Sequence, residues 1–313
     1  MDDLFIVNGG YPLKGEIEVS GAKNVVLPAL VAGLLTEEKV VLENVPLIAD
    51  LFSMIHIAQR LGVKTSLNGH ELTIENSYFL NQEISLEAGA KLRTSFMMII
   101  RLLLRFGKAA IPNPGGCRIG ARPVERLVEG LEGLGVKIKY NPDDGYFHAE
   151  AKKLVGTNYK FPKNSHMGTE MMLMAAALAE GKTVLENAAL EPEVDDLIKL
   201  LNQMVAKIKR VKPRTIVVEG VKKLNGTSYK IMSDRNEVVT LAIAGIATGG
   251  DILVKGADQK VLQLFLEKLT QAGAGWEALE NGIRFYYKNS LSVVDIETSC
   301  YPGFMTDWQA PWA

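Results

Sequence analysis

A pattern that recurs roughly every 70 residues constrains the fold of this 313-residue chain more than any other feature. In its first copy, an apolar segment at 25–35 is typical of a helix, and a charged turn then leads into the strand 40–44. A second helical pattern covers 48–61, and two short strands within 63–74 are joined by Asn68-Gly69, a hairpin signal. The turns of successive copies are anchored at Lys39, Lys108, Lys182 and Asp251.

This repetition predicts an α/β fold in which several copies pack around a common interior, because each copy has one helix face and one sheet face to bury. A chain of 313 residues also exceeds the size at which a single core usually stops growing, so we expect two domains. Four copies are present, and a fifth begins at Thr306 and stops almost at once. We therefore expect the C-terminus to be cut rather than finished.

Composition narrows the functional classes. The net charge of −1 provides no overall attraction to nucleic acid or to an anionic membrane, so any anion must be bound by a local cluster of cations. The most apolar run, 96–104, is too short to span a bilayer and contains Arg101, which predicts a buried helix. The acidic first residues do not resemble a signal peptide.

The residues that commonly bind metals are sparse. Cys117 and Cys300 form no CxxC pair, and a chain with few cysteines and no export signal is typical of the reducing cytosol. We predict a cytoplasmic protein that uses no cofactor. We also predict no metal site, because no histidine pair has ligand spacing among His56, His70, His148 and His166.

The loop 111–123 is the most informative segment for chemistry. Its prolines and glycines break both helix and strand, and it carries Cys117 with Arg118 and Arg122 one and five residues further on. Nearby cations favour the thiolate form of a cysteine, so the loop predicts a reactive thiol. The alternative is a small residue in a tight turn. Cys300 has no cation beside it in the sequence, and we interpret it as structural.

Polar residues recur where the helices of the repeats begin. Lys23-Asn24 enters the first helical pattern, and Arg93 occupies the matching place in the second copy. Helix N-termini offer free N–H groups and a positive dipole end, so cations there suit an anionic ligand. The alternatives are a solvated lysine and, for Asp234, Thr306 and Asp307, simple N-capping.

Three motifs in order resemble the UDP-N-acetylglucosamine 1-carboxyvinyltransferase family. They are Gly-Ala-Lys-Asn at 21–24, the loop 114–123, and the segment 301–310 that contains Thr306 and Asp307. The resemblance extends along the whole chain, because 185–189 and 233–235 also match at the family's spacing.

The resemblance implies transfer of the enolpyruvyl group of phosphoenolpyruvate to the 3′-hydroxyl of UDP-N-acetylglucosamine, a step of peptidoglycan precursor synthesis. It implies two lobes, each an inside-out α/β barrel of three repeated units, with the active site between them. The first lobe would be complete at 22–231, whereas 1–21 and 232–313 would form a partial second lobe with exposed apolar faces.

The resemblance also implies roles for individual residues. Cys117 would add to phosphoenolpyruvate and assist proton transfer, and Asp307 would be the general base for the sugar hydroxyl. Three cations would hold the phosphate and carboxylate groups, because arginine forks match both: Lys23, Arg93 and Arg122. The nucleotide sugar would contact Asn24, Arg122, Pro123, Val124, Lys163 and Ser165.

The match departs from the commoner family residues at 125–126 and 164–167. Three hypotheses stay open from the sequence. The chain is a shortened form of the transferase, or a module that binds the nucleotide sugar without turnover, or an enolpyruvyl transferase of the shikimate pathway. The last lacks the loop cysteine, so Cys117 argues against it.

Overall fold

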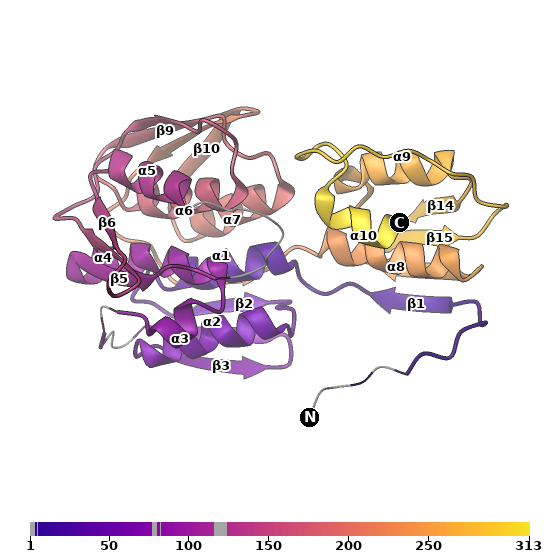
Figure 1. The fold of residues 1–313 in the computed structure, drawn as a ribbon, viewed down its shortest axis with the longest axis horizontal. Helices are drawn as coiled ribbons and strands as arrows, with labels where there is room; N and C mark the ends of the chain where they lie inside the picture. The colour runs from indigo at the N-terminus through magenta and orange to yellow at the C-terminus, as the bar shows by residue number, and fades with distance from the viewer. Residues whose placement is uncertain (1–3, 5, 77–79, 82, 116–123) are drawn as a thin grey trace. The chain divides into compact units, whose positions relative to one another are not determined.

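The computed structural model describes residues 4, 6–76, 80–81, 83–115 and 124–313, and the chain divides into two compact units (Figure 1). We refer to residues 21–232 as the large unit, and to residues 1–20 together with 233–313 as the small unit. The large unit is thus inserted into the small one along the sequence.

The large unit contains three copies of the predicted repeat. The first comprises α1 (Lys23–Gly33), β2 (Val40–Glu43), α2 (Ala49–Arg60), β3 (Lys64–Asn68) and β4 (Glu71–Glu75). The second comprises α3 (Leu86–Gly89), the 3-10 helix η1 (Arg93–Met98), α4 (Ile99–Phe106), β5 (Lys108–Pro112), α5 (Glu125–Gly133), β6 (Lys137–Asn141) and β7 (Tyr146–Glu150). The third comprises β8 (Asn158–Lys160), α6 (His166–Ala177), β9 (Lys182–Glu186), α7 (Pro192–Gln203), β10 (Lys207–Lys212), β11 (Thr215–Glu219) and β12 (Thr227–Lys230).

Each repeat builds one antiparallel three-stranded core sheet, β2-β4-β3, β5-β7-β6 or β9-β11-β10. In each case, the segment that follows the last core strand of one sheet joins the edge of the next sheet in parallel. Thus β8 pairs with β9, residue Glu83 bridges to Ala110 of β5, and β12 returns to pair with β2. The three repeats are therefore linked in a closed ring.

The sheets lie at the periphery of the large unit and the helices lie inside (Figure 1). Helices α1 and α6 are buried on nearly all sides, from Val25 to Gly33 and from Gly168 to Ala177. Both pack against α7, and each lacks the polar face that a surface helix needs. The α/β class predicted from the sequence is confirmed.

The small unit contains a fourth copy. It comprises β1 (Lys14–Glu18), α8 (Arg235–Ala247), β13 (Asp251–Lys255), the 3-10 helix η2 (Gln259–Val261), α9 (Gln263–Gln271), β14 (Gly275–Leu279), β15 (Gly282–Tyr286), the 3-10 helix η3 (Thr306–Trp308) and α10 (Gln309–Trp312). Its sheet has the order β1-β13-β15-β14, with β1 parallel to β13. The β1 strand therefore occupies the edge position that β8 and β12 occupy in the large unit.

Two expectations about helices were wrong in detail. The single helix expected at 96–104 is a 3-10 turn followed by α4, because the Ser95 hydroxyl donates to the carbonyls of Leu92 (2.6 Å) and Gly89 (2.8 Å) and competes with α-helical bonding. The apolar patterns at 171–178 and 238–247 also predict helices, but α6 and α8 begin earlier, at His166 and Arg235. Their first turns are polar and are capped by Ser165 and Asp234.

Candidate active site

Lys23 is the first residue of α1, and about half of its side chain is exposed. Its Nζ lies 2.6 Å from Oδ2 of Asp50, which is in the first turn of α2. This ion pair fixes the N-termini of the two helices side by side, where free N–H groups and helix dipoles favour an anion. Asn24 is half-buried beside Lys23.

The backbone before Lys23 is held by close contacts that require particular residues. A Cβ at Gly21 would lie 1.8 Å from the carbonyl oxygen of Asn44, so this position excludes every side chain. Asn44 has a positive φ of 60° and donates its amide to the carbonyl of Ile231 (3.0 Å). The N–H of Ala22 donates to the carbonyl of Met232 (2.8 Å), so the two ends of the large unit lie side by side.

A buried hydrogen-bond network connects α7 to the residues that precede α1. Asp196 accepts bonds from the hydroxyl of Tyr229 (2.8 Å) and from the N–H of Met232 (3.2 Å). Burial raises the pKa of Asp196, and these two bonds oppose that shift. The N-terminal half of α7 therefore lies close to the start of α1.

Arg93 and Val124 also stand where helices begin. Arg93 is half-buried at the start of η1, which packs against α1. Val124 is buried directly before α5, and its carbonyl accepts bonds from the N–H groups of Leu127 (2.8 Å) and Val128 (3.0 Å). The side chain of Val124 is thus part of the core.

Lys163 and Ser165 precede α6. Lys163 is exposed, whereas Ser165 is half-buried and caps the helix, with its Oγ accepting from the N–H of Gly168 (3.1 Å). Helix α6 packs against both α1 and α5. The described residues predicted for the large unit therefore all lie within three residues of the first residue of a helix.

A group of buried ionisable residues beside Ser165 was not predicted from the sequence. His166 Nε2 lies 3.2 Å from Oε1 of Glu170, one turn along α6, and Glu191 and Glu193 approach from the start of α7. Burial disfavours the charged imidazole, but the attraction of the carboxylates outweighs it and raises the pKa of His166 to about 9. The signal was a histidine and a glutamate four residues apart within an apolar run.

Asp307 lies in the small unit, within η3, and is exposed. Its neighbour Trp308 is buried, and the indole N–H donates to Oδ1 of Asn236 at the start of α8 (2.8 Å). Asp234 accepts hydrogen bonds from the N–H groups of Asn236 (2.7 Å) and Glu237 (3.3 Å). It is therefore the N-cap of α8, as one interpretation of the sequence proposed. Cys300 is exposed in the turn that precedes η3.

Three predicted site residues lie outside the described residues: Cys117, Arg122 and Pro123. Their proposed roles therefore rest on the sequence.

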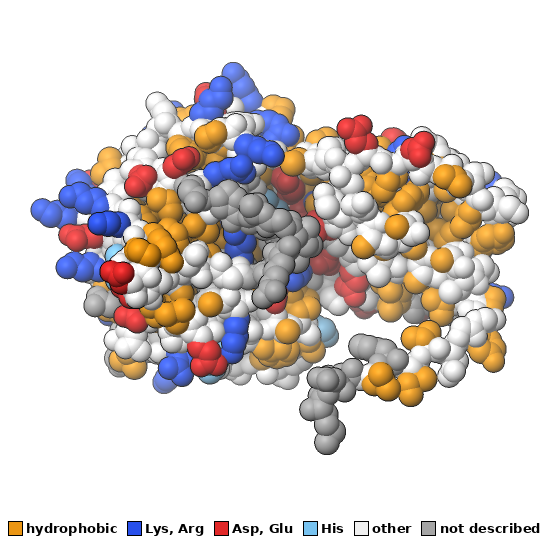
Figure 2. All heavy atoms as spheres, viewed as in Figure 1, with side chains coloured by type: hydrophobic (Ala, Val, Ile, Leu, Met, Phe, Trp, Pro, Cys, Tyr) orange, Lys and Arg blue, Asp and Glu red, His pale blue; other side chains and the backbone are white. Residues whose placement is uncertain are grey.

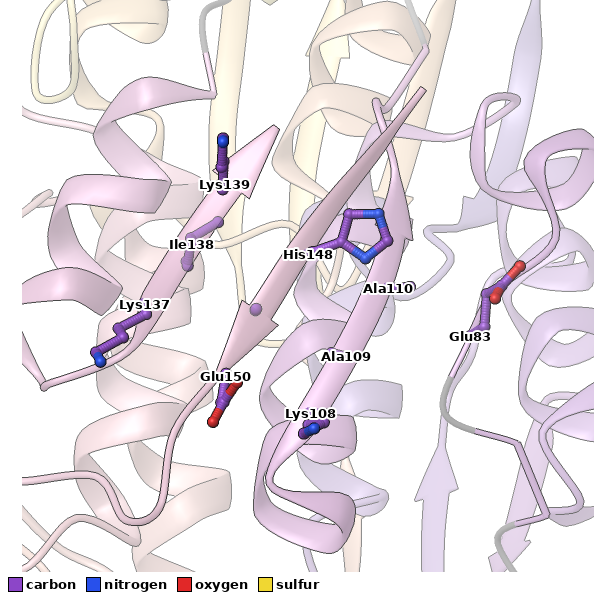
Figure 3. A pocket seen from close by; sticks show the side chains of 10 residues that line it. Glu83, Lys108, Ala109, Ala110, Lys137, Ile138, Lys139, His148 and Glu150 are labelled. Carbon is purple, nitrogen blue, oxygen red and sulfur yellow. The ribbon is translucent and has the colours of Figure 1, made fainter. Parts of the chain in front are cut away.

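A pocket of about 520 Å³ lies elsewhere, on the face of the sheet β5-β7-β6 that is turned away from the helices (Figure 3). The charged side chains on these strands are exposed and come from alternate positions. They include Lys108, Lys139 and Glu150. This is the pattern of a solvated sheet face, and we assign it no ligand. Lysine and arginine side chains are spread over the visible face of the large unit rather than gathered in one patch (Figure 2).

Among the residues that the structure describes, no group of three or more His, Cys, Asp or Glu side chains is arranged to hold a metal ion. None of the described helices has the length and apolar character needed to cross a membrane.

A family model described as EPSP synthase (3-phosphoshikimate 1-carboxyvinyltransferase) matches residues 7–313, which places the chain among the carboxyvinyltransferases. The chain is 41% identical to the UDP-N-acetylglucosamine 1-carboxyvinyltransferase of Koribacter versatilis, over 99% of this chain and 72% of that protein. It is 44% identical to the enzyme of the same name from Beijerinckia indica subsp. indica, over 99% of this chain and 74% of that protein. The chain belongs to the UDP-N-acetylglucosamine 1-carboxyvinyltransferase family.

Solved structures support the fold. The enolpyruvyl transferase NikO from Streptomyces tendae superimposes with a TM-score of 0.86 at 21% identity, over 97% of this chain and 72% of that one. An EPSP synthase from Acinetobacter baumannii gives a TM-score of 0.70 at 19% identity, over 92% and 68%. The predicted enolpyruvyl-transferase fold is thereby confirmed. The curated relatives named above do not favour the shikimate-pathway alternative.

Proposed function

We propose that this chain transfers the enolpyruvyl group of phosphoenolpyruvate to the 3′-hydroxyl of UDP-N-acetylglucosamine and releases inorganic phosphate. The observation that carries the proposal is the 41–44% identity to enzymes of this name over 99% of the chain. The reaction would supply a precursor of peptidoglycan in the cytoplasm, and so contribute to the cell wall, cell shape and division.

Phosphoenolpyruvate carries a phosphate and a carboxylate, and both need cations. We assign these groups to Lys23, Arg93 and Arg122. The first two stand at helix starts, where the dipole adds to the charge of the side chain. Lys23 has an ammonium group with three donors, so it can contact a substrate oxygen while it keeps its ion pair with Asp50.

The sugar hydroxyl must lose a proton as its oxygen bonds to the enolpyruvyl carbon, and the phosphate must leave. We assign the proton to the carboxylate of Asp307, which is exposed and so accessible to a substrate. Cys117 would add to phosphoenolpyruvate and assist proton transfer. The nucleotide sugar would contact Asn24, Arg122, Pro123, Val124, Lys163 and Ser165.

The test is phosphate release by the full chain with both substrates present, with each substrate omitted in turn, and with the product identified by its mass. Asp307→Asn should lower kcat by about 100-fold or more, since general bases typically contribute 10²–10⁴-fold. A matched control is Asp258→Asn, an exposed aspartate at the start of η2 whose capping bond an asparagine can keep. Binding of the nucleotide sugar without phosphate release would contradict the proposal and favour a binding module.

A further inference from the structure

Arg235 is the first residue of α8, and only 1% of its surface is exposed. Its guanidinium carbon lies 4.7 Å from the ring centroid of Tyr301 and 5.6 Å from that of Trp308. Both rings belong to the segment that carries Asp307. One buried arginine therefore contacts this segment at two points, six residues and one residue away from the proposed base.

The helix itself gives no reason for a cation at this position. The N-terminus of a helix carries the positive end of the dipole, so an arginine in the first turn is unfavourable for α8. Burial of the guanidinium adds a desolvation cost. The contacts of the guanidinium offset these costs, and they include the aromatic rings of Tyr301 and Trp308.

A hydrogen bond also joins α8 to the segment that carries Asp307. The indole N–H of Trp308 donates to Oδ1 of Asn236, the next residue of α8, at 2.8 Å. Trp308 also packs edge-on against Phe304, with ring centroids 5.4 Å apart. The backbone on both sides of Asp307 is therefore docked, while the carboxylate of Asp307 remains exposed.

We propose that Arg235 is a positioning residue, which sets the place of the Asp307 carboxylate by stacking on Tyr301 and Trp308. The inference rests on the proposed function, in which Asp307 takes the proton from the sugar hydroxyl. A displacement of about 1 Å at a catalytic group can lower the rate about 100-fold, so loss of this docking should appear in kcat.

The variant to measure is Arg235→Lys, which keeps the charge but loses the planar group that stacks. Its kcat should fall about 10- to 100-fold, with the KM of each substrate within about twofold. The matched control is Arg284→Lys in the same unit, because Arg284 also stacks on a tyrosine (Tyr286, 5.0 Å) but far along the chain from Asp307. Its kcat should stay within about twofold.

The positioning role is separated from general damage in the Asp307→Asn background. There, Arg235→Lys should slow the remaining reaction by less than about twofold, because the group that it positions is already absent. A slowing as large as that in the wild-type background would overturn the proposal, since it would indicate damage unrelated to Asp307.

Hydrogen exchange of the backbone gives a readout that does not need turnover. Arg235→Lys should accelerate exchange in peptides covering 298–308 by about 10-fold or more, whereas Arg284→Lys should leave them unchanged. If Arg235→Lys fails to fold, Asn236→Ala takes its place, with a smaller acceleration expected from the loss of one bond. Unchanged exchange would overturn the proposal. If the wild-type chain shows no turnover, the proposed function fails and exchange alone decides whether Arg235 docks the segment.

Discussion

The ion pair between His166 and Glu170 should make the stability of the large unit depend on pH in a specific window. The perturbation is the double variant His166→Gln with Glu170→Gln, which removes both charges and keeps similar size and hydrogen-bonding groups. Removing only the histidine would leave the buried carboxyl group of Glu170. Burial raises the pKa of Glu170, so its titration would obscure the result.

The magnitude follows from the pKa of His166, which rises from about 6.5 in the unfolded chain to about 9 in the folded one. A raised pKa means that the folded state holds the proton more tightly, so the stabilisation is fully present below pH 6.5 and disappears as the pH passes 9. A shift of this size corresponds to at most about 3 kcal/mol. For a unit of this length, that is a change in Tm of about 6–12 °C.

The assay is thermal unfolding of the wild type and the double variant at half-unit steps from pH 6 to pH 9.5. The wild-type Tm should fall relative to that of the variant over this range, whatever the offset between them at pH 6. The control is His148→Gln with Asp144→Asn, a pair 2.8 Å apart that is exposed on both sides, where solvent screening should leave no such difference. Parallel Tm curves for the wild type and the His166 variant would refute the reasoning.

Two further predictions concern the thiols and the entry to the large unit. A small phosphonate epoxide should label Cys117 at least 10-fold faster than Cys300, because only Cys117 has arginines close to it in the sequence. Peptide mass spectrometry would measure the ratio of the two rates. Faster labelling of Cys300 would contradict this prediction. Gly21→Ala should destabilise the large unit by about 3 kcal/mol, since its Cβ would collide with the carbonyl of Asn44. In the control Gly9→Ala the new Cβ meets no atom within 4 Å, so the Tm should stay unchanged. Equal Tm values for the two variants would exclude the collision.

The local elements of the fold could be predicted from sequence because they are set by local patterns. The hairpin at Asn68-Gly69 and the strand at 40–43 follow from turn residues and alternating apolar positions. The edge pairing between repeats could not be predicted. The residues of β12 pair with those of β2 far earlier in the chain, and such a contact leaves no mark on the composition of either strand.

The candidate site, like the fold, could be predicted only in part from the sequence. Cations and capping residues at helix starts are recognisable, because the chemistry of a helix N-terminus selects them, and Lys23, Arg93 and Ser165 do stand there. The burial of His166 and Arg235 was not predicted, because charged side chains are normally interpreted as surface residues. Only tertiary packing identifies the carboxylates and aromatic rings that accompany them.

The insertion of the large unit into the small one has a consequence for synthesis on the ribosome. Strand β1 is made first, but its partner β13 emerges only after the whole large unit; Glu16 and Lys255, which form an ion pair, are 239 residues apart. The ends of the large unit meet through Ala22 and Met232, so this unit can close while the nascent chain is still growing. Its closure brings the two flanking segments of the small unit together, and the loop entropy of pairing β1 with β13 is then that of a short connection rather than of the full chain.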